Sequence, residues 1–217
     1  MLIGLLVIVL AGGRMYLLSG AGQGLVTSFV TGKKLGDYGR INVEGLHGDL
    51  FDDFTIDTVT VTDADGVWLE AKQVRVDWSF WPLVMRRFHA TNIEADVVRL
   101  IRRPKVEPSG NPPGRQPISV DIDRFAADVE LLEGFSQEYG RWKLAGDVEL
   151  PRVGPKTATL AADSNSRPGD FLRLKASLGD ELADIRLDLR ANEAQGGPLA
   201  GALGYSPDQP FSAVALV

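Results

Sequence analysis

Two histidines and a few acidic turn residues are the groups in this sequence that could support catalysis or metal binding. The 217-residue chain contains His47 and His89 and no cysteine. His47 lies close to Asp52 and Asp53, but a metal or acid–base site needs convergent ligands in fixed geometry, and these carboxylates belong to a local turn. His89 has no recognisable partner in the sequence. We therefore predict no catalytic residue and no metal site, and a protein that is not an enzyme.

Other motifs point the same way. The segment from Asp63 to Gly66 faintly resembles the start of a calcium loop but lacks the later ligands, so a hairpin turn explains it. No phosphate-binding loop or nucleophile elbow is present, and we expect no cofactor. The formal net charge of −6 argues against a nucleic-acid partner, because such proteins usually carry a basic excess.

The beginning of the chain is apolar. Met1 to Leu18 is dominated by Leu, Ile and Val and is interrupted by Arg14; the residues up to 32 are uncharged and rich in Gly, Ser and Thr. A membrane-spanning helix needs about 20 mostly apolar residues. We expect residues 1–32 to be a membrane anchor and juxtamembrane segment. A cleaved signal peptide and a buried core helix remain as alternatives.

After Lys34 the hydrophobic pattern changes to a period of two, which puts one row of side chains on each face of a strand. Apolar and polar residues alternate in several runs between turn signals, which predicts a mainly β, antiparallel sheet of about ten strands with one apolar face. The runs are 67–72, 74–78, 118–123, 142–150, 172–178 and 185–190. Between two of them, Ser79 to Arg87 is apolar, contains a proline and ends in two arginines. We expect a short helix or turn there, at the sheet edge.

Four sections follow from these patterns. We expect the anchor at 1–32, a first sheet section at 33–104, a Pro- and Gly-rich loop at 105–117 and a continuing sheet section at 118–217. Strand-like residues still occur at 211–217, and an apolar unpaired edge is something proteins avoid. The expectation is therefore a fragment of a longer sheet.

Several short motifs resemble those of the TamB group of AsmA-like proteins, the inner-membrane subunits of the translocation and assembly module. They are VEGLHGDL at 43–50, DADGVWLEA at 63–71, VDWS at 76–79 before Pro82, RWKLAG at 141–146 and GGPLA at 196–200. Each motif is weak by itself, but their order and spacing cover nearly the whole chain from Gly39. The resemblance is therefore carried by the set of motifs.

That resemblance implies an N-terminal transmembrane helix followed by an elongated sheet, curled into an open, taco-like groove with an apolar interior. It implies a single-pass protein of the bacterial inner membrane with its β region in the periplasm. The implied function is bridging the two membranes for phospholipid transport and outer-membrane protein assembly. The implied partners are phospholipid acyl chains, the inner membrane and a TamA-like outer-membrane barrel, the last contacted through a C-terminal region absent from this chain.

Simple alternation gives the residues expected to line the groove. They are Val67, Leu69, Val74, Val76, Trp78, Ile118, Val120, Ile122, Trp142, Leu144, Val148, Leu172, Leu174, Ile185, Leu187 and Leu189. The intervening Glu70, Lys72, Asp147, Arg173, Lys175 and Arg186 should face water. The tryptophans fit equally well in the core of a closed β-sandwich, so an anchored sandwich that binds a ligand and a scaffold that presents sheet edges to client strands remain as alternatives.

Overall fold

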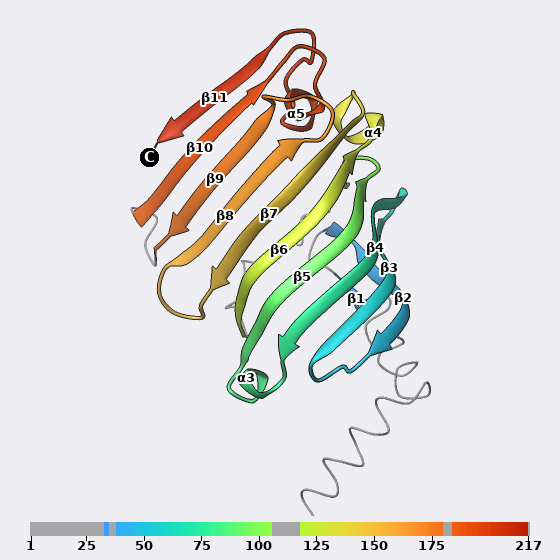
Figure 1. The fold of residues 1–217 in the computed structure, drawn as a ribbon, viewed down its shortest axis with the longest axis vertical. Coiled ribbons are helices and arrows are strands. Elements are labelled where there is room, and N and C mark those ends of the chain that lie inside the picture. Colours follow the sequence, from blue (N-terminus) through green and yellow to red (C-terminus); the bar gives the residue numbers. More distant parts are fainter. Residues whose placement is uncertain (1–32, 35–37, 106–117, 180–183, 217) are drawn as a thin grey trace, which may run out of the picture.

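The computed structural model describes residues 33–34, 38–105, 118–179 and 184–216. Its strands form one open sheet in which each strand pairs with its neighbour in the sequence (Figure 1). The strands are β1 (Lys33–Lys34), β2 (Arg40–Gly48), β3 (Asp53–Asp63), β4 (Gly66–Ser79), β5 (Arg87–Leu100), β6 (Ser119–Leu131), β7 (Gly140–Leu150), β8 (Lys156–Ser164), β9 (Phe171–Leu178), β10 (Ile185–Glu193) and β11 (Phe211–Leu216). The mainly β prediction is therefore confirmed.

Among the residues that the structure describes, three short helices lie at the ends of strands. α3 (Trp81–Val84) joins β4 to β5 at one end of the sheet, as expected for the apolar segment with Pro82. α4 (Glu133–Ser136) and α5 (Pro198–Ala202) contact each other at the opposite end of the strands (Figure 1). The two ends of the strands therefore differ: α3 lies at one end, and α4 and α5 lie at the other.

The pairing is antiparallel with one exception. β5 and β6 are parallel, with Arg87 opposite Ser119 and Leu100 opposite Leu131. The chain leaves β5 at the α4 end and enters β6 at the α3 end, so the expectation of a purely antiparallel sheet was wrong at this pair. A parallel pair cannot be joined by a tight hairpin, whereas the other neighbours can. Residues 106–117 of the predicted loop lie outside the described residues.

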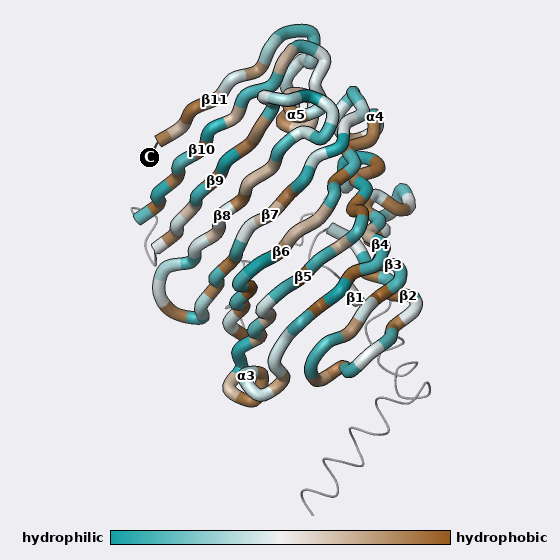
Figure 2. The backbone as a smooth tube through the Cα atoms, viewed as in Figure 1, coloured by the Kyte–Doolittle hydropathy of each residue, from teal (hydrophilic) through white to brown (hydrophobic). Residues whose placement is uncertain are grey.

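Directly opposed residues share a face of the sheet, so the strand registers define an apolar face and a polar face. One row of the apolar face crosses from β2 to β11 without a charged residue. It runs through Gly48, Phe54, Val76, Ile93, Phe125, Gly146, Leu160, Leu174, Leu189 and Ala215. Hydropathy alternates along the strands accordingly (Figure 2).

The alternation changes phase where the sheet bends. In β4, Leu69 and Ala71 share the apolar face with Val74 and Val76, so Gln73 between them is an extra residue with φ of 50°. Gly45 occupies the matching position in β2 with φ of 67°. Such irregularities increase the local bend of a strand. Strands β1–β4 turn away from the plane of β6–β11 (Figure 1), and the apolar face stays continuous through the bend.

The buried core is concentrated beside α5. Trp142 is 3% exposed and packs with Leu199 of α5 in a cluster completed by Val129, Leu131, Ala162 and Ala191. α5 thus covers the apolar face at the α4–α5 end. All described strands belong to one sheet, so within the described ranges no second sheet packs on this face as a sandwich would require.

Candidate functional surface: the apolar face of the sheet

Most predicted lining residues lie on one face. The strand registers place fourteen of them on the apolar face: Leu69, Val74, Val76, Trp78, Val120, Ile122, Trp142, Leu144, Val148, Leu172, Leu174, Ile185, Leu187 and Leu189. Ile118 lies immediately before β6. Whether these residues contact lipid is a prediction that strand register does not address.

Val67 is the exception. A β-bulge in β4 shifts the register between Val61 and Thr62, so that Val67 pairs with Thr62 while Leu69 pairs with Val61. The extra residue is Trp68, which is 9% exposed and donates its indole N–H to the carbonyl oxygen of Tyr38 at 2.9 Å. Val67 is therefore on the polar face and is 38% exposed. Its assignment to the lining row was wrong, because one inserted residue moves the rest of a strand to the other face.

The polar face is held by cross-strand ion pairs. A row through β4, β5, β6 and β7 alternates Glu70, Arg99, Glu130 and Arg141. Arg99 lies 3.4 Å from Glu70 and 2.8 Å from Glu130, and Arg141 lies 3.4 Å from Glu130. Opposite charges on directly opposed strands stabilise a register. All six residues expected to face water, among them Lys175 and Arg186, lie on this face.

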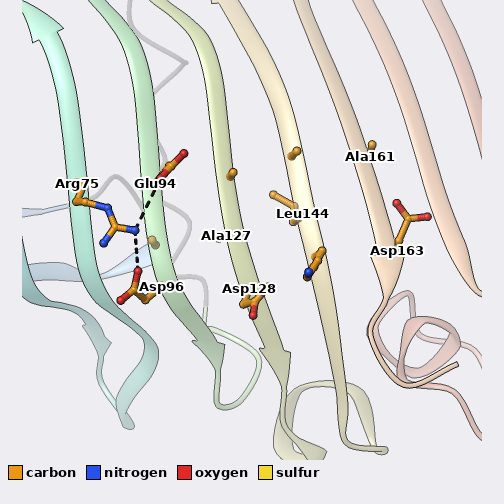
Figure 3. Close-up of a pocket in the computed structure, with 12 residues that line it drawn as sticks. Arg75, Glu94, Asp96, Ala127, Asp128, Leu144, Ala161 and Asp163 are labelled. Carbon is orange, nitrogen blue, oxygen red and sulfur yellow. Dashed lines mark hydrogen bonds and ion pairs between the residues drawn. The ribbon is translucent and has the colours of Figure 1, made fainter. Parts of the chain in front are cut away.

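A hollow on the polar face shows what that side offers. Arg75 contacts Asp96 at 2.8 Å and Glu94 at 3.7 Å, and the hollow is also lined by Asp128, Lys143, Asp163 and several alanines (Figure 3). Six of its twelve lining residues are charged, and Arg75 pairs with two of them. Charged groups of both signs therefore stand beside small apolar ones in this hollow, unlike the uncharged row of the apolar face.

Exposure varies along the apolar face. Residues near α5 are buried, whereas Leu172, Leu174, Leu187 and Leu189 are half-buried. At the α3 end of β9 and β10, Leu178 is 39% and Ile185 is 43% exposed. The part of the face farthest from α5 is therefore the most accessible to a ligand.

Aromatic rings gather where β4 and β5 meet α3. Trp78 stacks on Phe88 with ring centroids 5.5 Å apart, and Phe80 contacts Phe51 edge-to-face at 4.9 Å. Sequence alternation identified Trp78 but missed Phe51, Phe80 and Phe88, because two of them lie in turns. The cluster forms an apolar surface at the α3 end of the sheet.

A buried carboxylate holds α5 in place. Glu193 is 1% exposed, and its two oxygens accept the backbone N–H groups of Leu199 and Ala200 at 2.6 and 2.7 Å. These are the first free donors of the helix, which need an acceptor. Burial raises the pKa of Glu193, while the two backbone hydrogen bonds oppose that rise. Sequence reasoning missed this residue because its partners come from a later turn.

Neither histidine is isolated. His47 Nε2 lies 3.0 Å from Asp57 Oδ2, so its partner is across the β2–β3 pair rather than Asp52 or Asp53. The hydrogen bond from His47 is the main reason that the pKa of Asp57 is lowered. Among the described residues, His89, Asp121 and Asp123 have ligand atoms close enough to hold a metal ion. Arg87 already pairs with Asp121, and its positive charge opposes a cation there.

Comparison with known proteins identifies no relative. No family model matches the chain, and searches of curated proteins and of solved structures gave no match. Within the residues that the structure describes, no helix is long and apolar enough to cross a membrane. The predicted anchor at 1–32 lies outside those residues.

Proposed function

We propose that this chain is the inner-membrane-anchored, periplasmic part of a TamB-like protein that carries phospholipid acyl chains along its apolar face. In this proposal the protein bridges the inner and outer membranes and assists outer-membrane protein assembly with a barrel partner. No residue needs to perform covalent chemistry. The apolar surface acts by shielding hydrocarbon from water.

One observation carries the proposal: a row of ten opposed residues, from Gly48 in β2 to Ala215 in β11, contains no charge. Exposing an acyl chain to water costs about 0.8 kcal/mol per CH₂. A continuous apolar strip removes much of that cost at each step. The charged polar face keeps the same strands soluble on their other side.

Site-specific photo-crosslinking in intact cells tests this function. A photoreactive residue at Leu144 or Leu174 should crosslink phospholipid, because both lie on the apolar face. Matched probes at Lys143 and Lys175 are one residue away on the polar face and should crosslink none. Equal lipid labelling at all four positions, or labelling at none, would reject the proposal.

A further inference from the structure

The α3 end of the sheet presents a compact group of exposed apolar side chains. Trp81 is 73%, Val84 68% and Met85 79% exposed. Scattered exposed apolar residues are ordinary, but three within one short turn are a surface feature that calls for a partner. In Figure 1, α3 is at the lower end of the strands, away from α4 and α5.

Hydrogen bonds place the β7–β8 loop beside this turn. The backbone N–H of Ser119 donates to the carbonyl of Arg86 at 2.8 Å, and the N–H of Arg152 donates to Ser119 Oγ at 3.1 Å. The next residue, Val153, is 77% exposed. We call Trp81, Val84, Met85 and Val153, together with Arg86 and Arg152, the rim patch.

The turn is fixed rather than free to collapse on the sheet. Leu83 N–H donates to Phe80 O at 3.0 Å and Met85 N–H to Pro82 O at 3.0 Å. The Phe80 ring packs against Phe51 and, with centroids 6.3 Å apart, against Trp81. These hydrogen bonds and ring contacts therefore hold the turn in a conformation that leaves its apolar side chains exposed to water.

The composition of the rim patch fits a bilayer surface. Tryptophan is enriched at membrane–water interfaces, and aliphatic side chains insert into the acyl boundary while basic ones stay at head-group level. No acidic residue occurs in 80–86 or 151–155, although Asp49, Asp52 and Asp53 flank Phe51, whose ring contacts Phe80. A stable protein interface uses about 20–30 residues per side, many more than the six of the rim patch. These points favour a membrane over a protein partner.

We propose that the rim patch docks on a bilayer that contains anionic lipids, with Trp81, Val84 and Met85 in the interface and Arg86 and Arg152 at phosphate groups. This docking is independent of lipid transfer along the apolar face, because a domain that only binds or scaffolds could dock in the same way.

The cysteine-free chain allows a direct test, since a single introduced cysteine is the only labelling site. Met85→Cys would carry an environment-sensitive fluorophore. Leu203→Cys, at the end of α5 and 50% exposed, is the matched control. The full chain is reconstituted in phosphatidylcholine vesicles with and without phosphatidylglycerol. With anionic lipid present, brominated lipid should quench the probe at position 85 but not the probe at position 203.

Charge variants test the role of the arginines in the same assay. Arg86→Asn keeps a residue that tolerates the φ of 60° found at Arg86, and Arg152→Gln keeps length and polarity. Each should lower the ratio of docked to undocked probe about fivefold in anionic vesicles. Loss of phosphatidylglycerol should have a similar effect.

Three results would overturn the docking proposal. Quenching at position 85 no greater than at 203 would reject insertion, and quenching unaffected by anionic lipid or by the arginine variants would reject the lipid class. A probe that stays in water on vesicles but is shielded from a soluble quencher in native envelopes would assign the rim patch to a protein. Lipid crosslinking at Leu144 is scored separately, so failure here leaves the proposed function intact.

Discussion

The carboxylate of Asp57 occupies the space that a β-carbon on Gly45 would fill. The two residues face each other at the bend of β2 and β3, and Asp57 also accepts hydrogen bonds from His47 and Gln73 on the flanking strands. The positive φ of Gly45 and this close approach together explain why glycine stands at the bend.

Gly45→Ala should therefore destabilise the fold by about 2–3 kcal/mol, through left-handed strain and overpacking. Denaturant unfolding measures this change. Adding Asp57→Ala should recover the overpacking part, although Asp57→Ala alone should cost little. A double variant no more stable than the sum of the two single changes would show that the overlap with Asp57 is not the cause.

A second prediction concerns the carboxylate of Asp63. It accepts hydrogen bonds from Arg102 and from the backbone N–H of Lys105 at 2.6 Å, and the bond from Arg102 is the main reason that its pKa is well below its usual range. Asp63→Asn should lower the melting temperature at neutral pH. Asp65→Asn, at an exposed neighbour paired with Lys105 at 3.6 Å, should change it little.

The pH dependence follows from the sign of that shift. A carboxyl group with a lowered folded-state pKa stabilises the fold above its unfolded pKa of about 3.9 and loses this effect as the pH falls below that value. The difference in melting temperature between wild type and Asp63→Asn should therefore be constant near neutral pH and shrink in acid. A difference that grows on acidification would contradict the assignment.

The one-sided sheet could be predicted from the sequence, because a period of two places side chains directly. The runs 67–72 and 74–78 even show the change of phase, since apolar residues occupy odd positions in the first and even positions in the second. What alternation missed was the single extra residue at Trp68. It moved Val67 to the polar face, and no local pattern marks it.

Long-range partners were beyond sequence reasoning. The parallel pairing of β5 with β6 depends on where the intervening chain goes, and hairpin statistics favour the antiparallel arrangement that was expected. His89 finds Asp123 only through that pairing. Likewise, the sequence shows Glu193 only as a polar residue at the end of a strand, and its hydrogen bonds to α5 depend on the tertiary fold. Tertiary context decided each case.

A third prediction uses the raised pKa of Glu193. A carboxyl group whose folded pKa is raised favours the folded state most at low pH, and this contribution falls as the pH rises from its unfolded value of about 4.5. Wild type should therefore gain stability relative to Glu193→Gln as the pH is lowered from about 7 to about 4.5. Chemical denaturation across this range measures the difference.

Glu193→Ala provides the matching control. It removes both acceptors and leaves the N–H groups of Leu199 and Ala200 without them, which should cost about 1–3 kcal/mol; because alanine does not titrate either, this cost should also grow as the pH is lowered. If the difference between wild type and Glu193→Gln were independent of pH, Glu193 would not titrate in this range.

A last prediction separates an open lipid-binding face from a packed core. Leu174 is half-buried and lies between Leu160 and Leu189 on the apolar face, whereas Ala162 is 5% exposed within the core beside α5. A charge at Leu174 should repel acyl chains yet remain tolerable to the fold, because the site keeps some contact with water. Leu174→Asp should therefore give a folded, abundant protein that no longer crosslinks lipid through a probe at Leu144.

Ala162→Asp should unfold the protein, since a buried unpaired charge costs about 3–5 kcal/mol. Lys175→Asp, on the polar face next to Leu174, should preserve both folding and crosslinking. Circular dichroism and protein abundance report folding, and lipid crosslinking reports the surface. If Leu174→Asp unfolds the protein as severely as Ala162→Asp, Leu174 belongs to a closed core, and a binding module would explain the sheet better than a lipid bridge.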